Sequence, residues 1–406
     1  MSQATRDHVM TGFGFGPIQA GLFLHEAFLS GRFKRLVVAE VDAAMVQAVN
    51  GNGNRYTLNV ARASGVEKVD VRGVELIDPR AAGGREALVD TLAASTEVVT
   101  ALPSVEIFSA GGRDSVAALI ADGLSRRAGA PCIVYAAENH NRAAELLEAA
   151  VRRHAPALAN VQFLNTVIGK MSRVVTSADE ITAHDLAPMV PGAGRAFLIE
   201  AFSHILVTRT QLPGFVPGIG VFDEKDDLLP FEEAKLYGHN AVHALLGYLA
   251  LKRGYRMMSE MACDEALMKI GRKAFLDESG RTLMARHGGK DPLFTPEGFR
   301  AFADDLLERM VNPYLRDDVA RVTRDPRRKL AWDDRLVGTM RLAVNAGVQP
   351  RQFAKGARAA LDLVERQEPD KSPERILHDI WAKDDAEPRM VRTLTRLILC
   401  SPLSGL

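Results

Sequence analysis

Cysteine is scarce in this chain, which has only three in 406 residues. These three, Cys132, Cys263 and Cys400, lie far apart, and no pair has the spacing of metal ligands. An odd and sparse count is typical of a reducing compartment and argues against a disulfide framework. We therefore expect a cytoplasmic protein that has no structural zinc and needs no metal.

The chain also lacks an excess of charge, since 51 basic residues balance 51 acidic residues. A binder of nucleic acid or of an anionic membrane would need a basic surplus, although a local basic pocket for a small anion is compatible with the balance. Long apolar runs are missing too: Glu200 and His204 interrupt the stretch 196–207, and no run is long enough to span a bilayer. The first residues carry no apolar run of the signal-peptide type. We expect no nucleic-acid partner and no membrane partner.

The chain is long enough for two domains. Its first part alternates short strand-like runs, near 9–13, 36–40, 98–102, 132–137 and 161–164, with helix-like segments. This alternation predicts parallel β-α-β units in a doubly wound sheet. After about residue 230 only helical periodicity remains. We predict an α/β chain with a Rossmann-like NAD-binding domain over 1–195 and a mostly α-helical substrate and catalytic domain over 196–406.

A glycine-rich turn follows the first expected strand. Gly14 and Gly16 match the first two glycines of a dinucleotide fingerprint, but Gln19 stands where the third is expected. Small residues there let the backbone approach a pyrophosphate and aim a helix N-terminus at its charge. Coenzyme contacts are predicted at Gly14, Gly16, Pro17 and Ile18, although a plain strand-to-helix turn has a similar pattern.

Glu40 ends the second expected strand. An acidic side chain at this place binds the ribose hydroxyls of the adenosine and repels a 2′-phosphate, so NAD is favoured over NADP. The alternative for Glu40 is a solvated carboxylate at a strand end.

Lys235, Asn240 and His243 form the most informative pattern. On a helix that advances about 100° per residue, Asn240 lies roughly 140° and His243 roughly 80° from Lys235. A lysine whose pKa is lowered by roughly 2–3 units from about 10.4 can take the proton of an alcohol as its carbon gives up hydride. Asn240 can donate to the developing alkoxide, for about 2.7–4 kcal/mol, and His243 can orient the hydroxyl. The alternative is a helix with polar residues on one face.

This spacing of lysine, asparagine and histidine resembles the long-chain polyol dehydrogenases of the mannitol dehydrogenase family, and in particular the mannitol-1-phosphate 5-dehydrogenase branch. Further stretches resemble the same family: 13–16, 39–42, 312–322, 327–330 and 333–336. The resemblance implies NAD(H)-dependent interconversion of mannitol 1-phosphate and fructose 6-phosphate, with Lys235 as general base and acid.

The resemblance implies two further sets of residues. Asn139, which follows Glu138, would help to form the oxyanion site beside the coenzyme, or else it caps a helix. A basic cluster would hold the substrate phosphate, or else it is a solvated face: Arg321, Arg327, Arg328 and Lys329.

The chain departs from the family pattern where Gly169 and Lys170 replace an Asp-Arg pair. The carboxylate of that pair lies near the site in relatives, so its loss bears on the identity of the substrate. Two alternatives therefore stay open: a dehydrogenase for an unphosphorylated polyol or for an aldonate such as mannonate or altronate, and a non-catalytic NAD(H)-binding sensor. We expect a small-molecule partner and a monomer or small homo-oligomer.

Overall fold

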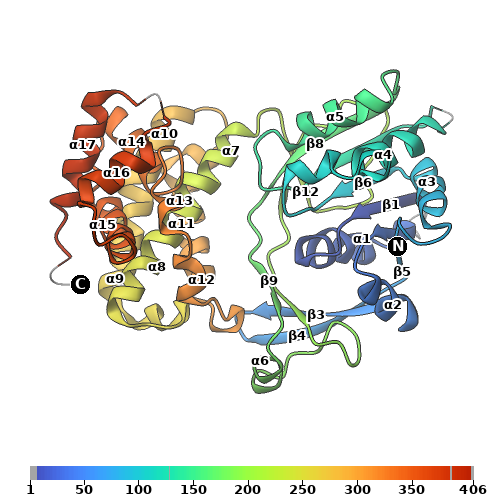
Figure 1. Cartoon of the computed structure of the whole chain (residues 1–406), viewed down its shortest axis with the longest axis horizontal. Helices are drawn as coiled ribbons and strands as arrows, with labels where there is room; N and C mark the ends of the chain where they lie inside the picture. Colours follow the sequence, from blue (N-terminus) through green and yellow to red (C-terminus); the bar gives the residue numbers. More distant parts are fainter. Residues whose placement is uncertain (1–6, 128, 385, 404–406) are drawn as a thin grey trace. The chain divides into compact units, whose positions relative to one another are not determined.

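The computed structural model describes residues 7–127, 129–384 and 386–403. The chain forms two compact units, the first ending at Leu228 and the second beginning at Leu229. Figure 1 shows an α/β first unit and a helical second unit. Each unit is described by itself.

The first unit is built on an eight-stranded sheet with the order β12-β11-β8-β7-β6-β1-β2-β5. The strands from β8 to β5 are parallel, and β11 is antiparallel to β8. The order β5-β2-β1-β6-β7-β8 is that of a Rossmann fold, with its switch point between β1 and β6. The bounds are β1 His8–Phe13, β2 Phe33–Ala39, β5 Val74–Ile77, β6 Glu97–Thr100, β7 Cys132–Ala136, β8 Val161–Ile168, β11 Ile205–Thr208 and β12 Phe222–Lys225.

Both faces of this sheet are buried, because successive side chains of a strand point to opposite faces. Val38 and Val99 belong to one apolar core, and Val37 and Val98 belong to the other. The sequences of these strands are therefore almost continuously apolar, as in other parallel sheets. The helices of this unit are η1 Gln19–Leu24 (π), α1 His25–Ser30, α2 Ala43–Gly51, α3 Gly84–Ala94, η2 Val105–Ser109 and η3 Gly112–Asp114 (both 3-10), α4 Val116–Ser125, α5 Ala143–His154 and α6 Ala178–Ala183.

A second sheet of the first unit has the order β4-β3-β10-β9. Its strands are β3 Arg55–Arg62, β4 Gly65–Arg72, β9 Ser172–Val175 and β10 Ala196–Glu200. It packs on the glycine-rich turn through Tyr56 and Phe197, whose rings contact the Phe15 ring edge-on at centroid distances of 5.0 and 5.7 Å. The Tyr56 hydroxyl donates to the Ala20 carbonyl at 2.7 Å.

The expected domain boundary after residue 195 lies inside the first unit. Three strands follow it, because β10 pairs with β3 and β11 and β12 extend the large sheet beyond β8. Their partners are far away in sequence, and local periodicity does not reveal such pairings. The predicted fold class, a Rossmann-type α/β unit followed by a helical unit, is confirmed.

The second unit surrounds α8, whose residues are almost all buried from Ala241 to Ala250. A helix that is apolar on all sides belongs inside a core. Glycines allow neighbours to approach it: a Cβ at Gly356 would lie 2.7 Å from Leu245, and one at Gly247 would lie 2.5 Å from Val322. The bounds are α7 Leu229–Glu233, η4 Ala234–Asn240 (π), α8 Ala241–Arg253, η5 Met258–Cys263, α9 Glu265–Lys273, η6 Ala274–Gly280 (π), α10 Arg281–His287, η7 Pro292–Phe294, α11 Pro296–Met310, η8 Pro313–Leu315, α12 Val319–Thr323, α13 Pro326–Lys329, α14 Val337–Asn345, α15 Arg351–Gln367, α16 Pro373–Trp381 and α17 Pro388–Leu399.

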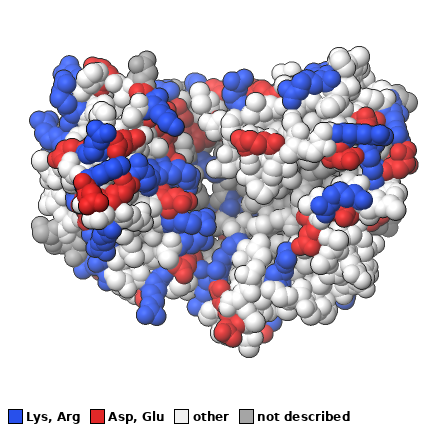
Figure 2. Space-filling model, viewed as in Figure 1, with Lys and Arg blue, Asp and Glu red and all other residues white. Residues whose placement is uncertain are grey.

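Three further observations bear on the class of protein. Within the described residues, no helix is long and apolar enough to cross a membrane. Basic and acidic side chains are interspersed on the visible face of each unit (Figure 2). All three cysteines are free thiols.

Candidate coenzyme and catalytic sites

A cavity of about 610 Å³ opens in the first unit at the carboxyl ends of β1, β2 and β6. This is the switch point of the sheet, where ligands bind in open α/β folds. All five residues predicted from the glycine turn and the second strand line it: Gly14, Gly16, Pro17, Ile18 and Glu40. The cavity is therefore placed and lined as a dinucleotide site requires.

Gly14 is required by the turn, since its φ is +82° and glycine adopts such values without strain. Its amide donates to the Ala39 carbonyl at 2.9 Å, and a Cβ would lie 3.1 Å from the Ala101 carbonyl oxygen. A Cβ on Gly16 would meet no atom within 4 Å. The backbone at Gly16 is thus open to a ligand, as phosphate binding at a helix N-terminus requires.

Gln19 stands in place of the third glycine, and the helix still packs closely against β1. Its buried side chain lies over Gly12, at the place that a Cβ of Gly12 would take. The small residue that allows close helix-strand packing is therefore on β1 rather than on the helix. The helix begins with a π-helical segment, η1, which starts at Gln19.

The Glu40 carboxylate joins the glycine turn to the end of β2. It accepts hydrogen bonds from the amides of Phe15 at 2.8 Å, Val41 at 2.7 Å and Asp42 at 2.9 Å. A carboxylate has about four acceptor positions, so capacity for a ribose hydroxyl remains. Glu40 is thus an acceptor fixed at the edge of the cavity.

Glu138 and Asn139 follow β7. The buried Glu138 carboxylate accepts from the Thr100 hydroxyl and the Leu102 amide, both at 2.9 Å, and burial raises its pKa. It therefore holds the ends of β6 and β7 together. Asn139 is exposed and does not cap α5, whose N-cap residue is Arg142. It lies outside the described lining of the cavity.

Lys170 is the buried cation that replaces the arginine of relatives. Its amine donates to the Phe202 carbonyl at 2.6 Å. Burial lowers the pKa of His25 to about 4, and the charge of Lys170 adds to this shift. It acts within the first unit as part of a local polar network.

Lys235 lies in the π-helical segment η4 of the second unit, which leads directly into α8. Hydrogen bonds in a π-helix join residues five apart, so Lys235 and Asn240 lie about one turn apart on the same side. His243 follows Asn240 by three residues on α8 and is its neighbour. The structure therefore brings the three residues to one side more closely than the 140° separation expected for an α-helix.

Burial lowers the pKa of Lys235 to about 8. The charge of Glu232 opposes this shift, and the charge of Arg335 adds to it. An amine with this pKa exists in both protonation states near neutral pH, as proton transfer in both directions requires.

His243 is held by an acidic residue that the sequence did not assign to the site. Its Nε2 atom is 2.7 Å from the Asp317 carboxylate, which also accepts from Arg321 at 3.0 Å. Burial of Asp317 opposes ionisation, but the hydrogen bond and charge of His243 and the charge of Arg321 outweigh it, and its pKa falls to about 2. Because an ionised carboxylate only accepts, Nε2 of His243 carries the hydrogen of this bond.

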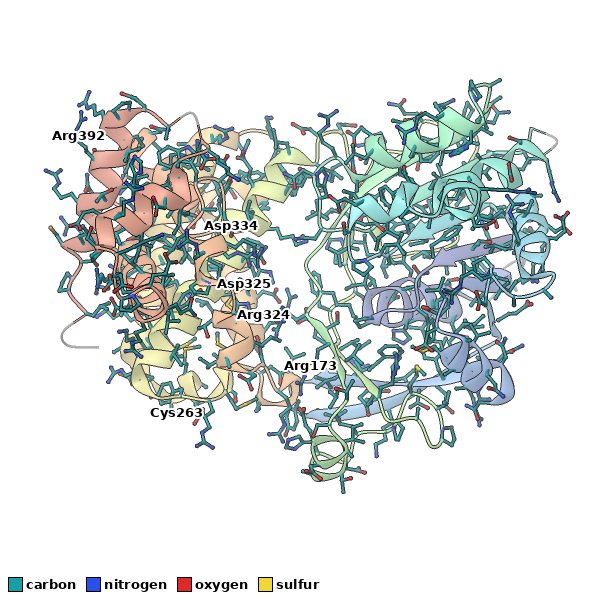
Figure 3. The ribbon with its side chains drawn as sticks, viewed as in Figure 1. Arg173, Cys263, Arg324, Asp325, Asp334 and Arg392 are labelled. Atoms are coloured by element: carbon teal, nitrogen blue, oxygen red, sulfur yellow. The ribbon has the colours of Figure 1, made fainter. Side chains whose placement is uncertain are left out.

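The four cations expected to hold a phosphate have separate partners within the second unit. Arg321 pairs with Asp317, Arg327 with Glu368, and Arg328 with Asp334 at 3.5 Å. Lys329 is buried and donates to the carbonyl of Arg324. Figure 3 labels Arg324, Asp325 and Asp334 in this region. A phosphate would have to compete with these partners.

Among the residues described, no group of three or more His, Cys, Asp and Glu side chains is arranged to hold a metal ion.

The fold and the two candidate sites define a chain with a Rossmann-type unit, which has a cavity at the switch point of its sheet, and a helical unit that carries a lysine of lowered pKa. Comparison with known families agrees with this class. Residues 227–389 match the mannitol dehydrogenase C-terminal domain.

Solved structures share the fold over nearly the whole chain. One is D-sorbitol dehydrogenase in substrate-free form, with a TM-score of 0.74 and 16% identity over 97% of this chain and 92% of the other. Another is Pseudomonas fluorescens mannitol 2-dehydrogenase in a ternary complex with NAD and D-mannitol, with a TM-score of 0.71 and 17% identity over 98% and 92%. At this identity the likeness concerns the fold.

Proposed function

We propose that this protein is an NAD-dependent polyol dehydrogenase in which Lys235 is the general base. The main support is that Lys235, Asn240 and His243 lie on the same side of the helix formed by η4 and α8, and that the pKa of Lys235 is lowered. The family of residues 227–389 supports the substrate class. The cavity at the glycine turn supports the coenzyme, because its turn and its Glu40 carboxylate suit an adenosine ribose without a 2′-phosphate.

In the direction of oxidation, neutral Lys235 removes the hydroxyl proton of the sugar alcohol. Asn240 donates a hydrogen bond to the oxygen as negative charge develops there. The second ring nitrogen of His243, whose ring is oriented by Asp317, accepts a hydrogen bond from a neighbouring hydroxyl and so positions the carbon that reacts. The bound nicotinamide supplies the acceptor for hydride. Protonated Lys235 returns the proton when a ketose is reduced, and the chemistry proposed for these residues needs no metal.

Within the first unit, Gly14, Gly16, Pro17 and Ile18 would hold the pyrophosphate, and Glu40 the ribose. Asn139 would join the oxyanion site as the family resemblance implies. The reaction requires that coenzyme and substrate meet, and this requirement is part of the proposal.

The first candidate substrate pair is mannitol 1-phosphate and fructose 6-phosphate. A basic cluster at Arg321, Arg327, Arg328 and Lys329 supports it, and the Lys329 amine donates its hydrogen bond to a backbone carbonyl, that of Arg324. A second candidate is an unphosphorylated polyol, which is favoured because the three arginines of the cluster are paired with acids.

The test is NADH oxidation with fructose 6-phosphate, fructose and fructuronate, and NAD reduction with mannitol 1-phosphate and mannitol. Turnover of the phosphorylated pair alone supports the first candidate, and turnover of fructose and mannitol supports the second. Lys235→Met should abolish turnover while NADH still binds. Lys252→Met is the matched control, because Lys252 lies on α8 and pairs with Asp362. Tight NADH binding without turnover of any substrate would instead identify a coenzyme sensor.

A further inference from the structure

The coenzyme cavity has a wall that a Rossmann fold alone does not supply. Val174 of β9 and Phe197 of β10, both from the second sheet, line it together with Arg195. Phe197 is buried and its ring is fixed against Phe15 of the glycine turn. Arg195 precedes β10, and its carbonyl accepts from the Met189 amide at 2.8 Å. The second sheet therefore holds Arg195 at the edge of the cavity.

Arg195 is the one basic side chain in the described lining of this cavity, whose acidic members are Glu40, Asp42 and Asp114. Its guanidinium is 3.4 Å from the second carboxylate oxygen of Asp42. The first oxygen of Asp42 caps α2 by accepting from the Ala44 and Met45 amides. The guanidinium thus lies beside Asp42, which is two residues beyond Glu40.

This ion pair leaves the arginine available to a ligand. Both side chains are about two-fifths exposed, at 41% and 38%, and such a pair contributes little on its own. An arginine has five N–H donors, and its bonds to a phosphate are shorter and stronger than a bond of 3.4 Å. In nucleotide folds the place beside the acid that ends the second strand is where an arginine accommodates a 2′-phosphate.

We propose that Arg195 is a second determinant of coenzyme choice, which offers a cation to the 2′ position of the adenosine ribose and opposes the NAD preference set by Glu40. The inference rests on the proposed function, since it assumes that the cavity binds a nicotinamide dinucleotide. It implies that NADPH binds weakly to the natural protein and that removal of the Glu40 charge exposes the contribution of Arg195.

The test measures dissociation constants of NADH and NADPH by coenzyme fluorescence for the natural protein, Arg195→Ala, Glu40→Gln and the double variant. Glutamine at position 40 keeps an oxygen for the backbone amides. We expect Glu40→Gln to strengthen NADPH binding, and Arg195→Ala in that background to weaken it by about tenfold or more. Loss of Arg195 should change NADH binding by less than about twofold in either background, because NADH lacks the 2′-phosphate. Arg209→Ala is the control: Arg209 pairs with Asp226 and Glu224 and is not in the lining.

Equal losses for both coenzymes would overturn the inference, because Arg195 would then contact a part that they share. Unchanged NADPH binding on loss of Arg195 in the Glu40→Gln background, or no NADPH binding there at all, would also overturn it. Arg195→Gln repeats the measurement if the alanine variant unfolds. Absence of NADH binding to the natural protein would refute the proposed function and this inference together, whereas the other outcomes refute the inference alone.

Discussion

The protonation of Lys235 gives the most direct test of the proposed chemistry. Its ordinary pKa of 10.5 falls to about 8 on burial. At pH 7 about one lysine in ten is then neutral, against about one in 3000 at the ordinary value, so burial raises the fraction of active base by about 300-fold. Below pH 8 the rate of polyol oxidation should fall about tenfold for each pH unit.

The perturbation is Arg335→Gln. Arg335 is a neighbouring cation that lowers the pKa of Lys235, so its removal should raise that pKa and move the oxidation profile to higher pH. Reduction of the ketose needs protonated Lys235 and should therefore persist to higher pH in the variant. The assay is kcat for each direction between about pH 6 and pH 10, with coenzyme saturating.

Two results would refute this reasoning. One is a rate of oxidation that stays flat through pH 8 although chemistry limits turnover, since the base would then be another group. The other is an acid shift on loss of Arg335, since the electrostatic relation between the two cations would then be wrong. Arg392→Gln is a suitable control because Arg392 lies on α17 and is not among the groups that shift Lys235.

Three further predictions concern named groups. Asp317→Asn should lower kcat by roughly tenfold or more with NADH binding unchanged, because His243 loses the carboxylate that sets its tautomer; steady-state kinetics beside a coenzyme titration tests this. Lys235→Met should raise the midpoint of thermal unfolding at pH 7. A lysine whose pKa is lower in the folded than in the unfolded protein reduces the free energy of unfolding by up to about 3 kcal/mol below pH 8. This destabilisation disappears as the pH rises to the pKa of the unfolded state. Burial raises the pKa of Glu278 from 4.5 to about 7, so the destabilisation by its buried charge is absent below pH 4.5 and complete above about pH 7. Glu278→Gln should therefore flatten the dependence of the free energy of unfolding on pH between these values. An unchanged slope would contradict the prediction.

The parts of the fold that sequence reasoning could predict are those governed by local pattern. β1, the glycine turn and Glu40 are consecutive features, and the structure places the turn and Glu40 around one cavity. The second sheet was not predicted, because β3 pairs with β10, more than 130 residues later. Arg195 lies just before β10, at the expected domain boundary, where no local signal marked it as a cavity residue.

For the helix that carries Lys235, too, local pattern predicted only a part of the arrangement. The spacing predicted Lys235, Asn240 and His243 as site residues, but the angle between them was worked out for a regular α-helix. Asp317 could not be placed beside His243, since 74 residues separate them. Its stretch resembles the family, yet resemblance does not say which acid pairs with which imidazole.

The π-helical segment η4 explains why the interval between lysine and asparagine is five residues and the next interval is three. Five residues make one turn where hydrogen bonds join i to i+5, and three residues are neighbours once the α-helix resumes. A π turn is rare and must be supported by its surroundings. Here the Tyr237 hydroxyl donates to the Asp333 carbonyl at 3.2 Å, and Ser279 of η6, itself π-helical, donates to the Tyr237 carbonyl at 2.5 Å. A chain one residue shorter between Lys235 and Asn240 could form a regular α-helix there. The spacing of the three polar residues and the irregular helix beneath them are therefore one feature, in which backbone geometry sets the positions of the proposed base and the proposed oxyanion donor.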